Sequence, residues 1–217
     1  MLQNTINIPK TKGYLDPNCL LEFRKYCKYG SNIEVQNDII ENFAFPLILK
    51  PNKGSMGLGV LKIDNIDELT AGIEIAFNQE NKLYDYVMLV QEYIDIKQEF
   101  RVFCVDRIAE LVYLKDNSLA QFDGNLSPLH WVGSSPKMIT NNELLTRIQT
   151  FINPIFAQIP VFWSGLDVVI DQYDKMFLIE INTAPSLSIF LEHNPDVVVY
   201  HLYQIGLKKF LDLPTKQ

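Results

Sequence analysis

The order of apolar and polar positions along the chain predicts a mixture of helices and strands. Ile66, Leu69, Ile73 and Phe77 recur at helical spacing, so residues 65–79 are predicted to form an amphipathic helix. Short apolar runs bounded by polar residues predict strands over residues 45–50, 60–63, 86–94, 99–105 and 109–115.

The remaining segments carry weaker or longer signals. Residues 1–45 have little pattern, and we expect one helix there, near residues 18–29. Residues 117–137 contain several glycines and prolines, which predicts a long loop. Three elements follow: a helix over residues 144–159, a hairpin over residues 165–182 and a last helix over residues 195–213. Because hairpins rather than regular βαβ units connect the strands, the predicted fold class is α+β with largely antiparallel sheets.

Composition limits the kinds of partner. The 217 residues are 47% hydrophobic and 21% charged, which is typical of a folded domain or two small ones. A net charge of −7 argues against binding to nucleic-acid phosphates or to an anionic membrane. No signal peptide or apolar run of about 18 residues is present. Cys19, Cys27 and Cys104 form neither a CxxC pair nor an even set, so we expect a reducing, cytoplasmic setting.

The hairpin over residues 165–182 carries two acids within apolar strands. Its expected register places Asp171 opposite Met176 and Asp167 opposite Glu180. Alternation then gives one wholly apolar core face, and the opposite face holds Asp167, Val169, Leu178, Glu180 and Asn182.

Two opposed carboxylates need a cation or a shared proton, because like charges directly across a ladder destabilise a sheet. Carboxylate and amide oxygens are typical ligands for Mg²⁺, which also accepts substrate phosphates. Two alternatives stay open at this point. The pair could lie on an exposed face where Lys or Arg neutralises it, or it could share one proton.

A glycine-rich turn joins two of the predicted strands. The segment from Lys50 to Gly59 supplies three glycines, two lysines and a serine. Glycines allow backbone N–H groups to approach an anion, and a lysine adds a point charge for phosphate. The spacing matches neither a P-loop nor GxGxxG, so a plain hairpin turn remains the alternative to a phosphate-binding loop.

Four blocks in this order resemble the ATP-grasp family: FPLILKPNKGSMGLGV, VMLVQEYIDIKQEFRVF, SGLDVVID and FLIEINTAPSL. The resemblance is to carboxylate–amine ligases such as D-alanine–D-alanine ligases and ligases that modify ribosomal proteins or peptides. It implies two α+β subdomains with largely antiparallel sheets that clasp ATP. The expected domains are a shortened N-terminal segment (1–44), a glycine-loop subdomain (45–94) and a C-terminal subdomain with the metal site (95–217).

The resemblance also implies a role for each matching residue. Lys50 would contact the α- and β-phosphates, the glycine loop would close over the triphosphate, and Glu99 would hold the ribose hydroxyls. The implied nucleotide-binding set is Lys50, Lys53, Gly54, Ser55, Gly57, Gly59, Gln91, Glu92, Tyr93, Ile94 and Glu99. Gln91 to Ile94 in this set would read adenine. The implied ligands of one or two Mg²⁺ ions, for which Mn²⁺ could substitute, are Asp167, Glu180 and Asn182.

Two basic residues are the implied catalytic groups. Arg101 and Lys115 are similar to residues that reach the phosphate or the acyl-phosphate intermediate. The alternatives are that Glu99 and Arg101, two positions apart on one strand, form a surface ion pair, and that Tyr93 serves in core packing.

The chain departs from the family pattern in three places. Only 49 residues precede Lys50, too few for the family's N-terminal substrate domain, so a shortened chain is expected. Gly165 stands where many peptide-forming members have an arginine, and Pro185-Ser186 stands where Pro-Gly is usual.

The resemblance implies an ADP-forming ligase that activates a carboxylate as an acyl phosphate and joins it to an amine, in peptide or amino-acid synthesis. Two alternatives stay open: a shortened ATP-binding module that acts with a partner and has no ligase activity, and a small-molecule kinase. The expected partners are a small-molecule or peptide substrate, and further copies of the chain or a subunit that supplies the missing domain. No nucleic-acid or membrane partner is expected.

Overall fold

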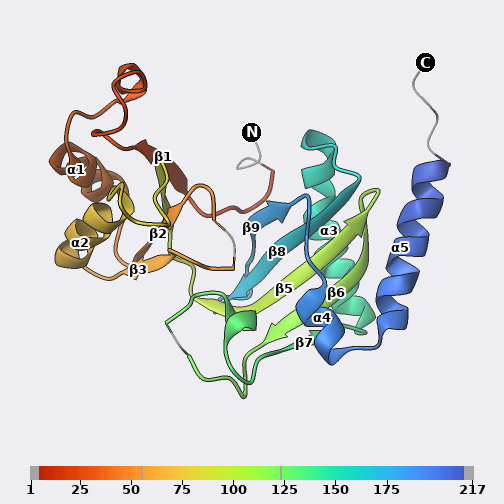
Figure 1. Ribbon diagram of the computed structural model, residues 1–217. Coiled ribbons are helices and arrows are strands. Elements are labelled where there is room, and N and C mark those ends of the chain that lie inside the picture. The colour runs from red at the N-terminus through yellow and green to blue at the C-terminus, as the bar shows by residue number, and fades with distance from the viewer. Residues whose placement is uncertain (1–4, 55, 123, 213–217) are drawn as a thin grey trace. The chain divides into compact units, whose positions relative to one another are not determined.

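The structure is a computed structural model that describes residues 5–54, 56–122 and 124–212, and it divides into two compact units (Figure 1). Unit 1 comprises the described parts of residues 1–8, 95–123 and 128–217, and unit 2 comprises those of residues 9–94 and 124–127. All strand pairings in the two sheets are antiparallel, which confirms the α+β fold class. None of the helices in the described part of the chain has the length and hydropathy needed to span a membrane.

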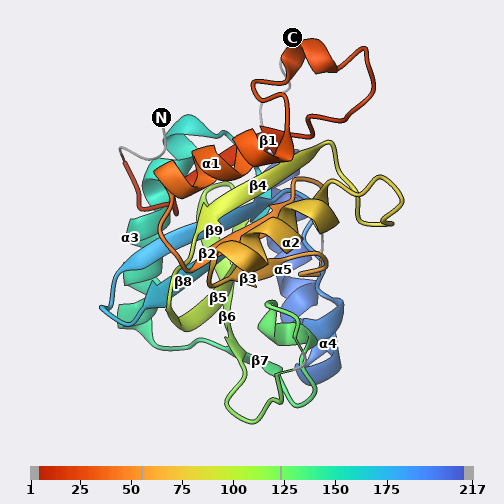
Figure 2. The same ribbon diagram turned by 90° about the vertical axis from the view of Figure 1, so that its left-hand side faces the viewer.

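Unit 2 is a four-stranded sheet covered on one face by two helices. Its strand order is β1 (Thr11–Leu15), β4 (Val87–Glu92), β2 (Leu47–Pro51) and β3 (Leu61–Ile63). The helices α1 (Asn32–Asn42) and α2 (Ile66–Ala76) lie side by side across the sheet (Figure 2). Their buried residues, among them Ile39 and Ile73, pack against Leu49 and Val90 of the central strands. This core holds in place the ends of β2 and β4, which carry the first of the candidate nucleotide-binding residues.

The helix predicted near residues 18–29 is wrong. That segment forms turns and a short 3₁₀ helix, η2 (Arg24–Tyr26), and leaves Leu21 79% exposed, so it has no apolar face to bury. The helix lies further along the chain, as α1. Its start follows from Ser31, whose Oγ accepts the N–H of Glu34 at 3.3 Å, while Glu34 Oε2 accepts the N–H of Gly30 at 2.8 Å.

Unit 1 is a five-stranded sheet with helices on both faces (Figure 1). Its strand order is β7 (Ser135–Met138), β6 (Ile108–Asp116), β5 (Ile96–Val105), β8 (Trp163–Asp171) and β9 (Met176–Asn182). The helix α3 (Asn142–Gln158) covers one face. The helices α4 (Ser188–His193) and α5 (Asp196–Leu211) cover the other, and a 3₁₀ helix, η3 (Pro128–His130), lies in the loop before β7.

The two faces of this sheet separate its core from its polar residues. Phe100 and Val102 of β5 face α3, whereas Phe103 faces α4 and α5. Because side chains alternate along a strand, Glu99 and Arg101 lie on the same face as Phe103. That face is apolar near α5 and polar towards the start of β5.

The units differ in extent from the predicted domains. Residues 9–44, expected as a separate N-terminal segment, are part of unit 2, because β1 pairs with β4 and Val35 is fully buried in the shared core. Residues 5–8 belong instead to unit 1, where Ile6 packs in the core beneath α3. Residues 124–127 return to unit 2 from the long loop.

The hairpin of β8 and β9 contains the predicted pair of acids but not the predicted register throughout. Asp167 lies opposite Glu180, as expected. Met176, however, pairs with Ile170 rather than with Asp171, because the register shifts between Asp167 and Val168. This bulge turns Leu178 into the core beneath α3, so its predicted place beside the acids is wrong.

Candidate functional site

Four charged side chains meet on the polar end of the sheet in unit 1. Glu99 and Arg101 lie on β5, Lys115 on β6 and Asp167 on β8. Arg101 pairs directly with Asp167 across the ladder, with Nε 2.7 Å from Oδ1. Lys115 Nζ binds Glu99 Oε1 and lies 3.2 Å from Asp167 Oδ1. We call these four residues the acid–base cluster.

The acid–base cluster is largely closed to solvent, which determines its protonation. Lys115 is 5% exposed and Asp167 is 6% exposed. Burial raises the pKa of Glu99 above its ordinary value, although Lys115 partly opposes this effect. Burial alone would lower the pKa of Lys115, but the nearby carboxylates of Glu99 and Asp167 outweigh it and raise the pKa. Lys115 therefore stays protonated at neutral pH, beside the permanently charged Arg101.

The three predicted metal ligands lie at the end of the same hairpin. Glu180 is directly opposite Asp167 on β9, and Asn182 is opposite Gly165. Glu180 is exposed, whereas Asn182 Oδ1 accepts the backbone N–H of Ala184 at 2.8 Å. Asp167 Oδ1 is buried, yet no donor within the described ranges makes an aligned hydrogen bond to it. Its negative charge is met instead by Arg101 Nε at 2.7 Å and Lys115 Nζ at 3.2 Å, so a metal ion at this oxygen would have to share it with these two cations.

The three predicted ligands suit some metal ions better than others. No group of three or more His, Cys, Asp or Glu side chains gathers into a metal site among the residues that the structure describes. A fully protein-built cage is therefore not present there. Two carboxylates and an amide suit an ion that keeps waters and takes further oxygens from phosphate, as Mg²⁺ does.

Gly165 lies beneath the acid–base cluster and leaves no room for a side chain. A Cβ there would lie 2.7 Å from Pro185 Cβ and 3.3 Å from Arg101 Cδ. The aliphatic part of Arg101 and the ring of Pro185 thus pack over the bare backbone. This explains the departure at Gly165, since an arginine at this position would displace both neighbours.

The glycine loop belongs to unit 2 and is anchored at several points. The side chain of Asp85 accepts the N–H of Lys53 at 2.6 Å, and Asn125 Nδ2 donates to the carbonyl of Met56 at 3.0 Å. Gly57 has φ +70°, and a Cβ there would lie 2.2 Å from Asn125 Oδ1. Only glycine fits that position. Ser55, predicted with this loop, lies outside the described residues.

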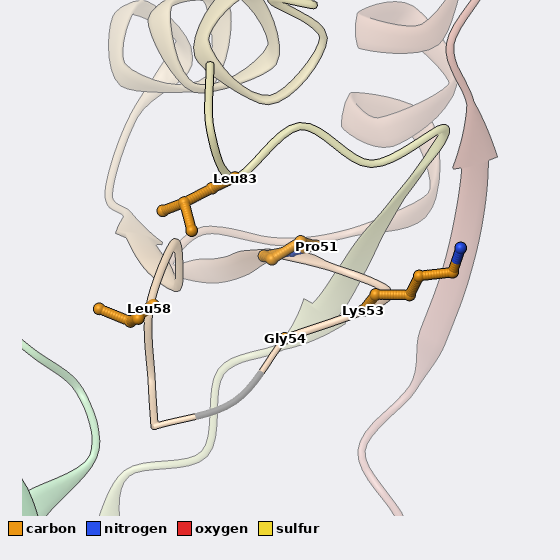
Figure 3. A pocket seen from close by; sticks show the side chains of 5 residues that line it. All are labelled: Pro51, Lys53, Gly54, Leu58 and Leu83. Atoms are coloured by element: carbon orange, nitrogen blue, oxygen red, sulfur yellow. The ribbon is translucent and has the colours of Figure 1, made fainter.

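A cavity of about 360 Å³ lies beside this loop, lined by Pro51, Lys53, Gly54, Leu58 and Leu83. Figure 3 shows Leu58 and Leu83 on one side of the cavity and the Lys53 side chain extending away from them. Its wall is therefore mainly apolar, and the ammonium group of Lys53 is directed elsewhere. A cavity of this kind accepts an apolar group rather than a phosphate.

Lys50 of β2 and the residues at the end of β4 form a second group of polar contacts in unit 2. Lys50 Nζ donates to Gln91 Oε1 at 3.1 Å, and Gln91 Nε2 donates to Thr11 Oγ1 at 2.9 Å. Glu92 is exposed, and its Oε2 accepts the N–H of Lys10 at 3.1 Å. Gln91 thus holds the ammonium group of Lys50 in place at the end of β4.

The two residues after β4 are less buried than the residues of a core strand. Tyr93 and Ile94 are half-buried, and the ammonium group of Lys62 lies 5.1 Å from the ring centre of Tyr93. Tyr93 does not belong to the buried clusters found among the described residues, so its alternative role in core packing is not supported. Gly54 and Gly59 remain with the loop, next to Pro51.

Three residues that contact these groups were not predicted from the sequence. Thr11, Asp85 and Asn125 hold Gln91, Lys53 and Met56, respectively. A strand at residues 11–15 would have suggested Thr11, because it lies opposite Gln91. Asn125 carries no local signal, since 69 residues separate it from Met56.

Comparisons with known proteins place the chain in a family. A family model described as the RimK-like ATP-grasp domain matches residues 25–197. A D-alanine–D-alanine ligase from Hydrogenovibrio crunogenus is 27% identical over 154 residues, which cover 69% of this chain and 47% of that protein. The chain thus spans about half the length of the curated relatives it matches.

Solved structures share the fold. The D-alanine–D-alanine ligase of Bacillus anthracis complexed with ATP has a TM-score of 0.60 at 15% identity, over 98% of this chain and 63% of that one. A RiPP-associated ATP-grasp ligase from Chryseobacterium gregarium, in complex with ADP and a leader and core peptide, has a TM-score of 0.52 at 16% identity, over 87% and 50% of the two chains. At these identities the likeness concerns the fold. Because the family model covers most of the chain, the protein belongs to the RimK-like ATP-grasp family.

Proposed function

We propose that this chain binds MgATP and uses it to activate a carboxylate for ligation to an amine. The observation that carries the proposal is the acid–base cluster in unit 1, where the buried Lys115 and the half-buried Arg101 lie beside a pair of opposed acids. Membership of a family whose relatives include D-alanine–D-alanine ligases supports this choice of chemistry.

Each unit carries its own set of proposed nucleotide-binding residues. In unit 2, Gln91 holds Lys50, which is proposed to meet phosphate, and the glycine loop would approach phosphate through the backbone of Gly57 and Gly59, because the N–H of Lys53 is already bound by Asp85. The segment from Gln91 to Ile94 contacts adenine. In unit 1, Glu99 binds Lys115 through Oε1, so a ribose hydroxyl would use Oε2.

Asp167, Glu180 and Asn182 are the proposed ligands of Mg²⁺. When bound, the ion offsets negative charge on the ATP phosphates. Asp167 is already shared with Arg101 and Lys115, so the ion and the two basic side chains compete for its carboxylate. We therefore expect Arg101 to turn part of its guanidinium towards a phosphate when the nucleotide is bound.

In the proposed reaction, a substrate carboxylate attacks the γ-phosphorus of ATP, and ADP leaves with the electron pair of the broken bond. The acyl phosphate is then attacked by an amine, which gives an amide and inorganic phosphate and releases a proton. Catalysis of phosphoryl transfer depends mainly on positioning and on fixed positive charge. Arg101 and Lys115 supply that charge from rigid, adjacent strands.

The acceptor is a small molecule or a peptide, and the family relatives offer both classes. One relative is a D-alanine–D-alanine ligase, and one structural neighbour holds a leader and core peptide. The loop from residue 117 to residue 137 is proposed as the acceptor side. It exposes Leu119 and Val132, 84% and 79% accessible, so its surface suits an apolar side chain.

The test is an ADP-release assay with the full chain, MgATP and panels of carboxylic acids, amines and alcohols. A ligase releases ADP only when an acid and an amine are both present, and the amide appears by mass spectrometry. ADP formed with an alcohol alone would replace the proposal with a kinase. MgATP binding without turnover on any panel would replace it with an ATP-binding module that acts with a partner.

A further inference from the structure

Three consecutive hydrogen bonds connect β1, β4 and β2 in unit 2. Thr11 Oγ1 donates to the carbonyl of Pro9 at 3.0 Å. Gln91 Nε2 donates to Thr11 Oγ1 at 2.9 Å, and Gln91 Oε1 accepts from Lys50 Nζ at 3.1 Å. Thr11 and Gln91 are direct partners in the β1–β4 ladder. We call these three bonds the hydrogen-bond chain.

Donor and acceptor types give the hydrogen-bond chain a single direction. An ammonium group only donates, so Gln91 must present its amide oxygen to Lys50. The amide NH₂ group then faces Thr11, whose oxygen must accept from it. The hydroxyl hydrogen of Thr11 is left for the carbonyl of Pro9, which only accepts. The orientation of the Gln91 amide therefore depends on the hydroxyl of Thr11.

The three side chains of the hydrogen-bond chain lie on the same face of the sheet. Leu49 and Val90, the neighbours of Lys50 and Gln91, belong to the core shared with α1 and α2. Because side chains alternate along a strand, Lys50 and Gln91 lie on the opposite face, with Thr11 across the ladder from Gln91. This face of the sheet is therefore the one that presents Lys50.

The side chain of Gln91 is occupied at both ends. It is 8% exposed, its oxygen binds Lys50 and its nitrogen binds Thr11. Its amide is therefore engaged in holding the lysine, and adenine contacts of the segment after it would use other groups. The amide is also neutral, so it orients the ammonium group without contributing an opposing charge.

We propose that Thr11 is a positioning residue for Lys50, acts through Gln91 and tightens the binding of MgATP. This inference deepens the proposed function and rests on it, because Lys50 is there the residue that meets phosphate. Without the hydroxyl of Thr11, the buried amide of Gln91 has an N–H group with no partner, which favours another orientation of the amide. A turned amide presents N–H groups to Lys50, so the ammonium group loses its acceptor.

The first experiment measures the dissociation constant of MgATP by calorimetry for the parent chain, Thr11→Val and Thr11→Ser. Valine keeps the shape of threonine and suits a strand, but it removes the hydroxyl. Thr11→Val should weaken binding about fivefold or more, because a buried donor is left unpaired. Thr11→Ser restores the hydroxyl and should bind as the parent does.

Thr70→Val is the matched control for the first experiment. Thr70 is an exposed threonine of unit 2, and its hydroxyl also donates to a backbone carbonyl, that of Ile66 at 2.9 Å. It has no bond to the hydrogen-bond chain. Thr70→Val should therefore bind MgATP with the affinity of the parent.

The second experiment asks whether Thr11 acts through Lys50. Lys50→Met should weaken MgATP binding, and adding Thr11→Val to it should cause no further loss, because effects along one chain of contacts are not additive. Three results would overturn the role of Thr11 while MgATP binding by the parent stands: parent-like affinity in Thr11→Val, equal losses in Thr11→Ser and Thr11→Val, or the full Thr11→Val loss in the Lys50→Met background. A parent chain that does not bind MgATP would instead overturn the proposed function, and this inference with it.

Discussion

The guanidinium of Arg101 lies 2.7 Å from the buried carboxylate of Asp167, directly across the β5–β8 ladder. The two residues are 66 positions apart in the chain, and together with Glu99 and Lys115 they place two cations against two carboxylates inside unit 1. The same carboxylate is the predicted metal ligand. The pairing therefore sets two cations against the carboxylate of Asp167, which lies opposite Glu180 in the β8–β9 ladder.

Asp167→Asn should destabilise unit 1 strongly. The amide keeps the shape of the side chain but removes the negative charge, which leaves Arg101 and Lys115 with Glu99 alone. Removing one partner of a buried ion pair costs about 3 kcal/mol. Urea unfolding can be followed through Trp131 and Trp163, the two tryptophans of the chain, both of which belong to unit 1.

The matched control for this substitution is Asp174→Asn. Asp174 also forms an ion pair, with Arg147 at 3.0 Å, but its side chain is 63% exposed. Exposed pairs contribute less than about 1 kcal/mol. Equal effects of the two substitutions would show that the acid–base cluster is no more important to stability than a surface pair.

Lys115→Met should destabilise the protein more at pH 8 than at pH 5. Burial already raises the pKa of Glu99, and Lys115 is the main group that opposes this rise. Without it, Glu99 gains a still higher pKa in the folded state than its unfolded value of about 4.3. A carboxyl whose pKa is raised by folding destabilises the native state once pH rises above the unfolded pKa, and the cost grows up to the folded pKa.

Unfolding of Lys115→Met by urea at several pH values checks this dependence. Lys97→Met serves as the control, because Lys97 is exposed at the start of the same strand. The control should show no added pH dependence. A constant loss of stability from pH 5 to pH 8 in Lys115→Met would mean that Lys115 does not control the pKa of Glu99.

Gly57→Ala should disturb the glycine loop more than Gly124→Ala. Both glycines have positive φ, +70° and +95°, so each alanine carries a backbone cost of about 1 kcal/mol. A Cβ at position 57 would also lie 2.2 Å from Asn125 Oδ1, whereas a Cβ at position 124 meets nothing within 4 Å. Hydrogen exchange around Met56 should therefore rise only in Gly57→Ala. Equal exchange in both variants would show that the contact with Asn125 does not hold the loop.

Asp38→Asn should remove part of the acid sensitivity of unit 2. Burial alone would raise the pKa of Asp38, but hydrogen bonds from Lys12, Tyr29 and Tyr14 outweigh it and hold the pKa well below its ordinary value. Such a group stabilises the fold above its unfolded pKa of about 4, and this stability is lost as pH falls towards the folded pKa. The effect should stay below about 1 kcal/mol because the cluster is partly solvated.

The measurement is hydrogen exchange in α1 of the parent and of Asp38→Asn from pH 7 down to pH 3, after correction for intrinsic rates. The parent should lose protection faster than the variant below pH 4. Parallel curves would show that folding does not lower the pKa of Asp38.

Most strands and the pairing of Asp167 with Glu180 could be predicted because their signals are local. The hairpin of β8 and β9 has alternation and a short turn within one segment. The bulge beside Asp167 could not be predicted, since an extra residue on β9 has no mark of its own in the sequence. Contacts of Arg101 with Asp167 depend on the distant pairing of β5 with β8, which the pattern of neither strand specifies.

The N-terminal region was the least predictable part. Residues 18–29 contain apolar side chains that the fold leaves exposed, such as Leu21, so their spacing was misleading. The true helix α1 is marked by Ser31 and Glu34, a capping pattern three residues apart, and by Val35 and Ile39, which are fully buried. Capping residues were thus more informative here than apolar content.

The most direct test of the account is a calorimetric titration of the chain with ATP, with and without Mg²⁺, in the parent and in Glu180→Gln. Glu180 is exposed and opposite Asp167, so its substitution should leave the fold intact and remove a metal ligand. Glu192→Gln, on an exposed acid of α4, is the control. We predict Mg²⁺-dependent ATP binding in the parent and the control, and its loss in Glu180→Gln. Equal binding by the parent and Glu180→Gln in the presence of Mg²⁺ would contradict the metal site at the centre of this account.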